Sequence, residues 1–258
     1  MKKLFVLSKD FPNGGGPELL FWVGCAGSFD PRAQKVTKAF VQILQAAQVE
    51  FAILGNEEQC TGDPARRAGN EFVFQMLALQ NIETLNMHKV KKIVTTCPHC
   101  FNVLKHEYPP LGGHYEVMHH TQLLASLLQE GKLQIEGGRF DGQVITYHDS
   151  CYLGRANDVY EAPRSIVNHL DGALVEMKRS GSKGLCCGAG GAQMFKEDEP
   201  GSKRINAERT EEALELNPDV IAVNCPFCLT MMTDGLAEKD KQEKVMVYDL
   251  SELIVKQL

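Results

Sequence analysis

Short apolar runs alternate with longer amphipathic stretches along most of this 258-residue chain. Each apolar run has the length of a strand that is buried on both faces of a sheet, and the stretches between the runs are long enough to form helices. The predicted strands occupy residues 19–23, 51–54, 92–96, 115–118, 143–147, 173–177, 219–224 and 244–248. This alternation predicts an α/β fold in which parallel strands are joined by right-handed helical crossovers.

Helices are expected between these strands, because apolar residues recur there every three or four positions. The predicted helices occupy residues 31–47, 64–86, 122–129, 160–169, 203–216 and 249–256. In the first of them Phe40 and Ile43 lie on one apolar stripe. In the second, Phe72, Met76 and Leu79 share one face of the helix, and we expect that face to be part of the core.

The second half of the chain repeats the order of the first half. The repeat is clearest in the cysteines. Cys25 corresponds to Cys151 and Cys60 to Cys186, each 126 residues later. Cys97 corresponds to Cys225 and Cys100 to Cys228, each 128 residues later. A glycine-rich segment at residues 13–17 predicts that residues 1–18 are a flexible lead-in. We therefore expect a first domain at residues 19–138 and a second at 139–258, each with its own core.

Composition and charge exclude some classes of function. The formal net charge is −6 and no Lys/Arg-rich run is present, so a nucleic-acid-binding protein is not expected. The apolar stretch at residues 4–7 is shorter than the roughly 7–15 residues of a secretory signal. We expect a cytoplasmic protein, free or peripheral to a membrane through partner subunits. In that reducing compartment the nine cysteines point to ligation or redox chemistry and not to disulfides.

The cysteines follow predicted strands, and the carboxyl ends of parallel strands form the crevice where ligands bind. In the second half these residues are Cys151, Cys186, Cys187, Cys225 and Cys228. Thiols gathered at one sheet edge indicate a soft-metal or iron–sulfur site.

Two other interpretations of these cysteines are open. Cys97-Pro98-His99-Cys100 taken alone is also typical of a thioredoxin-like dithiol. A structural zinc site needs four thiolates, which fits the four cysteines of the first half. It fits the second half poorly, because a single tetrahedral ion has no place for a fifth thiol.

The second half resembles the cysteine-rich CCG domain of the B-type subunit of heterodisulfide reductase and its relatives. Those relatives include the iron–sulfur subunits of glycolate, glycerol-3-phosphate and lactate oxidation systems. The motifs that carry the resemblance are Cys151, the run Cys186-Cys187-Gly188 and the run Cys225-Pro226-Phe227-Cys228, and tandem copies cover nearly the whole chain. The resemblance implies two pseudo-symmetric domains, each a small Rossmann-like parallel sheet flanked by helices. It also implies that the five cysteines of the second half bind a noncubane [4Fe-4S] cluster.

The first copy departs from the family pattern, because Cys60-Thr61-Gly62 stands where a Cys-Cys doublet is expected. Cys25, Cys60, Cys97 and Cys100 remain, and they predict either a second [4Fe-4S] cluster or a zinc ion.

Some residues near the cysteines are weaker candidates. His148 and Asp149 would donate hydrogen bonds to cluster sulfur or move protons; alternatively, Asp149 caps a turn and His148 packs at a strand edge. Arg155 would balance cluster charge or lie at the surface. The histidines at positions 99, 119 and 120 are expected to be satisfied polar residues and not ligands.

The resemblance implies an oxidoreductase or electron-transfer subunit, in a disulfide reductase or a quinone-linked dehydrogenase complex. Electrons would pass between a partner flavoprotein or ferredoxin-type subunit and a quinone or disulfide acceptor. The chain has no ferredoxin cysteine run and no G-x-G-x-x-G after a strand, so the electrons must come from another subunit. The alternative is a zinc-stabilised scaffold subunit without a redox role.

Overall fold

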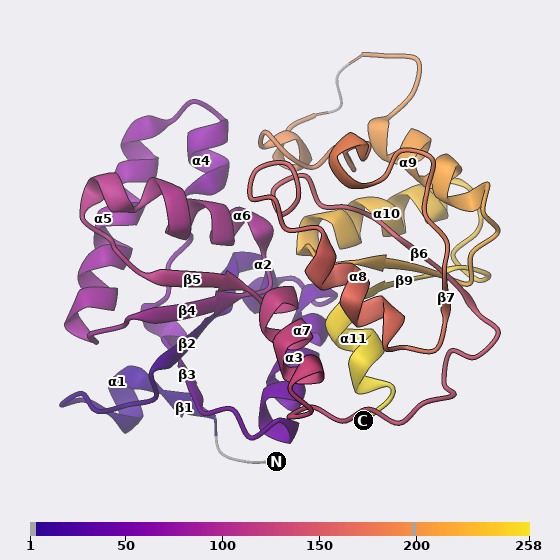
Figure 1. Cartoon of the computed structure of the whole chain (residues 1–258). Coiled ribbons are helices and arrows are strands. Elements are labelled where there is room, and N and C mark those ends of the chain that lie inside the picture. The colour runs from indigo at the N-terminus through magenta and orange to yellow at the C-terminus, as the bar shows by residue number, and fades with distance from the viewer. Residues whose placement is uncertain (1–3, 198–199) are drawn as a thin grey trace.

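The computed structural model describes residues 4–197 and 200–258 and confirms a mixed α/β fold with two parallel sheets flanked by helices (Figure 1). The first sheet has the strand order β1-β3-β2-β4-β5 and the second β7-β6-β8-β9. The strands of the first sheet are β1 (Phe5–Val6), β2 (Leu19–Trp22), β3 (Phe51–Ile53), β4 (Lys92–Thr95) and β5 (Glu116–His119). Those of the second are β6 (Val144–Tyr147), β7 (Ala173–Leu174), β8 (Val220–Val223) and β9 (Met246–Asp249). Strands β3-β2-β4-β5 and β7-β6-β8-β9 therefore follow the same order, as the sequence repeat predicts.

Helices connect these parallel strands. The α-helices are α1 (Leu7–Asp10), α2 (Gly24–Phe29), α3 (Ala33–Ala46), α4 (Asp63–Arg67), α5 (Glu71–Met87), α6 (Pro98–Asn102), α7 (His120–Gln129), α8 (Glu161–Asn168), α9 (Ile205–Leu214), α10 (Pro226–Glu238) and α11 (Leu250–Val255). A π-helical turn (Val103–Glu107) follows α6, and single 3-10 turns lie at Gly55–Glu57, Pro109–Leu111, Gly181–Lys183 and Gln193–Phe195. Every strand pairing is parallel, for example Leu20 with Ile93 and Ile145 with Val220.

The two halves share one layer of core between the sheets, which the sequence did not predict, and each half also has a hydrophobic cluster of its own on the outer side of its sheet. Helices α3 and α7 of the first half pack against α11 and α8 of the second, between the two sheets (Figure 1). One hydrophobic cluster runs through this layer and includes Phe40 and Leu127 from the first half with Ile166 and Leu253 from the second. The outer face of the first sheet is covered by α5, and that of the second by α9 and α10. This packing brings the carboxyl ends of both sheets close together.

Part of the predicted lead-in is ordered secondary structure. Phe5–Val6 form β1, which pairs in parallel with β3, and α1 follows directly. Residues 1–3 of the predicted lead-in lie outside the described residues. Two residues are too few to show a strand pattern in the sequence. The edge of β3 supplies the pairing that makes them a strand.

The predicted helix at residues 64–86 is two helices, and its predicted core face is wrong. Asn70 ends the first segment and caps α5 by accepting a hydrogen bond from the Val73 N–H (3.1 Å). Phe72, Met76 and Leu79 are 79%, 44% and 51% exposed. The reason is that α5 is apolar on two faces. The face that packs against the sheet contains Phe74, Ala78, Ile82 and Leu85.

Across the residues that the structure describes, no helix has both the length and the apolar character needed to cross a bilayer.

Candidate metal centre

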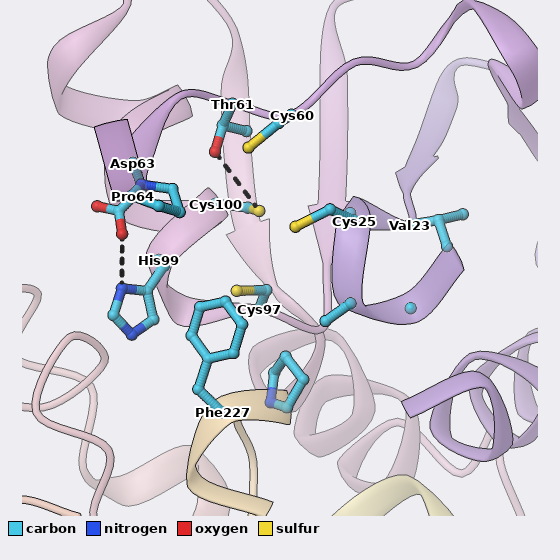
Figure 2. A pocket seen from close by; sticks show the side chains of 14 residues that line it. Val23, Cys25, Cys60, Thr61, Asp63, Pro64, Cys97, His99, Cys100 and Phe227 are labelled. Atoms are coloured by element: carbon cyan, nitrogen blue, oxygen red, sulfur yellow. Dashed lines mark hydrogen bonds and ion pairs between the residues drawn. The ribbon is translucent and has the colours of Figure 1, made fainter. Parts of the chain in front are cut away.

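The cysteines of the first half converge from three strand ends. Cys25 lies in the first turn of α2, after β2, and Cys60 lies in the loop after β3. Cys97 follows β4 as the N-cap of α6, and Cys100 lies within that helix. Figure 2 shows their four sulfur atoms directed toward one another around a small cavity. The parallel topology thus collects four thiols that are far apart in the sequence.

The cysteines of the second half occupy the equivalent places. Cys151 follows β6, the doublet Cys186-Cys187 lies in the long loop after β7, and Cys225 is the N-cap of α10, in which Cys228 lies. The Sγ atoms of Cys187 and Cys228 are 3.3 Å apart. All nine cysteines of the chain are free thiols.

Local geometry repeats between the two sites. The Gly188 N–H donates to Cys186 Sγ at 3.3 Å, and the Gly62 N–H donates to Cys60 Sγ at 3.4 Å. Both glycines have a positive φ (89° and 88°), which a side chain would oppose. At Gly190, by contrast, an added Cβ would meet nothing closer than 3.9 Å.

Thr61 takes in the first site the place that Cys187 takes in the second. The Thr61 hydroxyl donates to Cys100 Sγ at 3.7 Å (Figure 2), just as Cys187 contacts Cys228. Thr61 is buried at 2% exposure, so it fills the space of the missing fifth thiol and points the same way. The difference between the sites is therefore one ligand and not a change of fold.

The thiols in each site share protons. A hydrogen bond from Cys25 lowers the pKa of Cys60 to about 6. In the second site, hydrogen bonds from Cys151 and Cys187 lower the pKa of Cys186 below its usual range. Sulfur atoms this close cannot all be thiolates without a cation between them, and a metal that replaces the shared protons supplies that charge.

His99 links the two sites. Its Nδ1 is 2.9 Å from Asp63 Oδ2, and its ring stacks on Tyr152 with 4.0 Å between centroids. Burial opposes protonation, but hydrogen bonds to Asp63 and to Cys225 of the second site raise the pKa of His99 well above its usual range. In the opposite direction, Phe227 of the second half lines the cavity of the first site (Figure 2). The residue after proline in each Cys-Pro-x-Cys motif therefore reaches the other centre.

His148 and Asp149 are both buried. His148 lies at the end of β6, and the partners of Asp149 lie on α8 and in the loop before Cys186 and not in the next turn, which the alternative interpretation expected Asp149 to cap. Asp149 accepts two hydrogen bonds from Arg164, both at 2.9 Å, and one from the Gly181 N–H at 2.7 Å. It thereby ties the segment before Cys186 to α8. His148 Nδ1 accepts a hydrogen bond from Arg209 Nε at 3.0 Å.

Other charged residues near the cysteines have structural partners. Arg155 donates to the Gly184 carbonyl, in the loop that leads to the doublet. Asp63 is buried between His99 and Arg67. Arg66 forms an ion pair with Glu107.

Histidines 119 and 120 are satisfied polar residues, as expected. His119 Nδ1 is 2.8 Å from the Thr121 hydroxyl, and His120 Nε2 is 3.2 Å from Asp249 of the second half. Arg209 could not be identified from the sequence, because nothing near it in the chain relates it to the cysteines. Tyr152 directly follows Cys151, but the sequence does not show that its ring stacks on His99 of the first site.

The donor set fits an iron–sulfur cluster. Thiolates are the ligands that these clusters use, and the second site offers five of them. The buried Nε2 of His148 finds no hydrogen-bond partner among the described residues, although its ring faces that site. A buried polar atom without a partner in the protein is expected where a bound polar group completes its hydrogen bonding.

Comparison with known proteins gives matches over both halves. Residues 19–105 and 145–233 each match the cysteine-rich domain CCG. The "Probable iron-sulfur-binding oxidoreductase FadF" of Bacillus subtilis is 51% identical over 92% of this chain and 33% of that protein. The "EtfAB:quinone oxidoreductase" of Syntrophomonas wolfei is 46% identical over 93% of this chain and 34% of that protein.

A third relative comes from an archaeon. The D-type subunit of the "Dihydromethanophenazine:CoB--CoM heterodisulfide reductase" of Methanosarcina barkeri is 34% identical over 93% of this chain and 59% of that protein. The chain therefore spans about a third of the length of the first two relatives and less than two thirds of the third.

Proposed function

Because this chain belongs to the cysteine-rich CCG domain family, with two copies of the domain in tandem, we propose that it is an iron–sulfur electron-transfer subunit of an oxidoreductase. The observation that carries the proposal is the fifth thiol of the second site. A single tetrahedral ion uses four thiolates, whereas a cluster of several irons has room for more. The names of the Bacillus and Methanosarcina relatives, which mention iron–sulfur binding and heterodisulfide reductase, agree with this assignment.

The second site would hold a [4Fe-4S] cluster of noncubane type. Its ligands would be the five cysteines Cys151, Cys186, Cys187, Cys225 and Cys228. Such a cluster supplies electron-transfer chemistry at a potential set by its ligands, hydrogen bonds and burial. The chain's own residues fix the thiolates at strand and helix ends and exclude water, since Cys187, Cys225 and Cys228 are buried.

The first site would hold a [4Fe-4S] cluster or a zinc ion on Cys25, Cys60, Cys97 and Cys100. A cluster is supported by the contacts between the sites, because His99 and Phe227 reach across from one to the other. A zinc ion would make this half a structural support for the second site. Metal analysis separates the two cases, since they differ in iron, sulfide and zinc content.

We extend the partners named for the relatives to this chain as part of the proposal. The donor would be a flavoprotein or a ferredoxin-type iron–sulfur subunit, and the acceptor a quinone or a disulfide. The name of the Syntrophomonas relative mentions EtfAB and quinone, and that of the Methanosarcina relative mentions a heterodisulfide. Association with such partners would also place the chain in the cytoplasm or at the surface of a membrane.

The test is the Cys187→Ser variant, purified without oxygen. A five-thiol cluster site should lose or change its EPR signal, and its iron and sulfide content should fall or its cluster type change. Thr61→Ser is the matched control, because residue 61 is the equivalent position of the first site. It should leave the second-site signal unchanged. A Cys187→Ser protein that keeps full zinc content, with no cluster EPR signal in either the variant or the wild type, would favour a four-thiolate zinc site that uses Cys186.

A further inference from the structure

His148 is a buried side chain beside the second site with a polar atom that lacks a partner. One of its ring nitrogens and the Sγ atoms of Cys187 and Cys228 all lie within 4.8 Å of one another. The residue is 1% exposed, and its Nε2 has no hydrogen-bond partner among the residues described. By position alone, His148 would be either a metal ligand or a hydrogen-bond donor.

Arg209 decides between these roles. Its Nε carries a hydrogen and donates to His148 Nδ1 at 3.0 Å, so Nδ1 must present its lone pair. An imidazolium would carry a hydrogen on Nδ1 as well, so a ring whose Nδ1 accepts this hydrogen bond is neutral. A neutral imidazole with an accepting Nδ1 carries its proton on Nε2. Nε2 in that tautomer has no lone pair to give to iron.

The guanidinium of Arg209 is itself fixed in place. The residue is fully buried on α9, and its Nη1 donates to the Arg179 carbonyl at 2.8 Å and to Glu212 at 3.0 Å. These contacts oppose rotation of Arg209 away from His148. The tautomer of His148 is therefore set by the fold, through a charged partner that cannot give up its proton in the accessible range of pH.

We propose that His148 is a fixed Nε2–H hydrogen-bond donor to the sulfur of the second-site cluster and is not one of its ligands. Arg209 is the positioning residue that holds it in this state. This inference rests on the proposed function, since it assigns a role toward the cluster of that same site. A donor to cluster sulfur stabilises the more negative, reduced form and so raises the reduction potential.

The experiment compares His148→Phe with the wild-type protein, both prepared without oxygen. Iron and sulfide content is measured first, and an EPR-monitored redox titration then gives the midpoint potential of the second-site cluster. His148→Phe should keep the wild-type iron content and show a lower midpoint potential. His148→Gln retains an N–H donor and should recover part of the difference, which a purely structural role would not predict.

The wild-type protein supplies a second readout that needs no substitution. After exchange into D₂O, electron–nuclear double resonance should detect a deuteron coupled to the cluster, and this coupling should be absent in His148→Phe. Iron-replete protein with an unchanged potential and coupling in His148→Phe would overturn the inference and leave the proposed function standing. Loss of iron in His148→Phe would also overturn it, because it would identify His148 as a ligand. Wild-type protein without iron would refute the proposed function, and this inference with it.

Discussion

Glu212 and Glu208 provide a matched pair for testing which ion pairs stabilise this fold. Both lie on α9, one turn apart, and both contact Arg179, at 3.0 Å and 2.9 Å respectively. Glu212 also binds the fully buried Arg209, and its side chain is 8% exposed, whereas that of Glu208 is 47% exposed. Substitution of each by glutamine therefore removes a carboxylate charge, from a buried ion pair in one case and from an exposed ion pair in the other.

The expected effects differ because burial differs. Glu212→Gln leaves the Arg209 charge buried without its counter-charge, and removing one partner of a buried pair costs about 3 kcal/mol or more. Glu208→Gln removes an exposed pair that contributes less than about 1 kcal/mol. At about 2–4 °C per kcal/mol for a chain of this size, the first change should lower Tm by roughly 6–12 °C and the second by at most about 4 °C.

Thermal unfolding followed by circular dichroism, with anaerobic protein, measures both effects. The pH dependence adds a check. Burial raises the pKa of Glu212, but the Arg179 N–H and Arg209 outweigh it and hold that pKa below its ordinary value of 4.5. The stability from Glu212 is thus present above pH 4.5 and is lost as the pH falls through the lowered pKa. The difference in Tm between the wild type and Glu212→Gln should therefore become smaller over that range of pH. Equal and small decreases in the Tm of the two variants at neutral pH would refute the argument that burial makes the Glu212 ion pair the more stabilising one.

Three further predictions concern packing and the first site. A Cβ on Gly235 would lie 2.1 Å from Thr210 Oγ1, so Gly235→Ala should lower stability by about 1–3 kcal/mol despite better helix propensity, and adding Thr210→Ala should recover part of the loss in a melting experiment. Phe40 is fully buried in the shared core, so Phe40→Ala should cost about 3–5 kcal/mol, while Phe72→Ala at an exposed position should cost less than about 0.5 kcal/mol in the same assay. Thr61→Cys restores the fifth thiol of the first site and, with a cluster in that site, should change its EPR signal without altering the second. An unchanged first-site cluster signal would mean that Thr61 does not occupy the ligand position.

The sequence predicted the architecture well, because the apolar runs are short, regular and repeated. Each of the eight predicted strands lies within a few residues of a strand in the structure. The exposed face of α5 was predicted wrongly because Phe72 and Phe74 belong to two apolar faces of one helix, and only packing against the sheet selects between them. The shared core was also missed, since a repeat in sequence does not reveal how its copies pack. The domain boundary at residues 138 and 139 stays a prediction.

The sequence also placed the cysteines in two groups, since the strand ends at which parallel sheets collect ligands were visible from the pattern. It did not reveal that the groups adjoin through His99 and Phe227, because that contact depends on how the two halves face each other. Nor did it show the role of Arg209, which lies 61 residues from His148 in the chain. The metal bound by each group remains a proposal.

The most direct test of the central claim is the iron and acid-labile sulfide content of the protein purified without oxygen, measured per chain. The account predicts brown protein that contains at least the iron and sulfide of one [4Fe-4S] cluster, dependent on Cys187. Colourless protein that lacks iron and yet transfers electrons with its partners at full rate would contradict it.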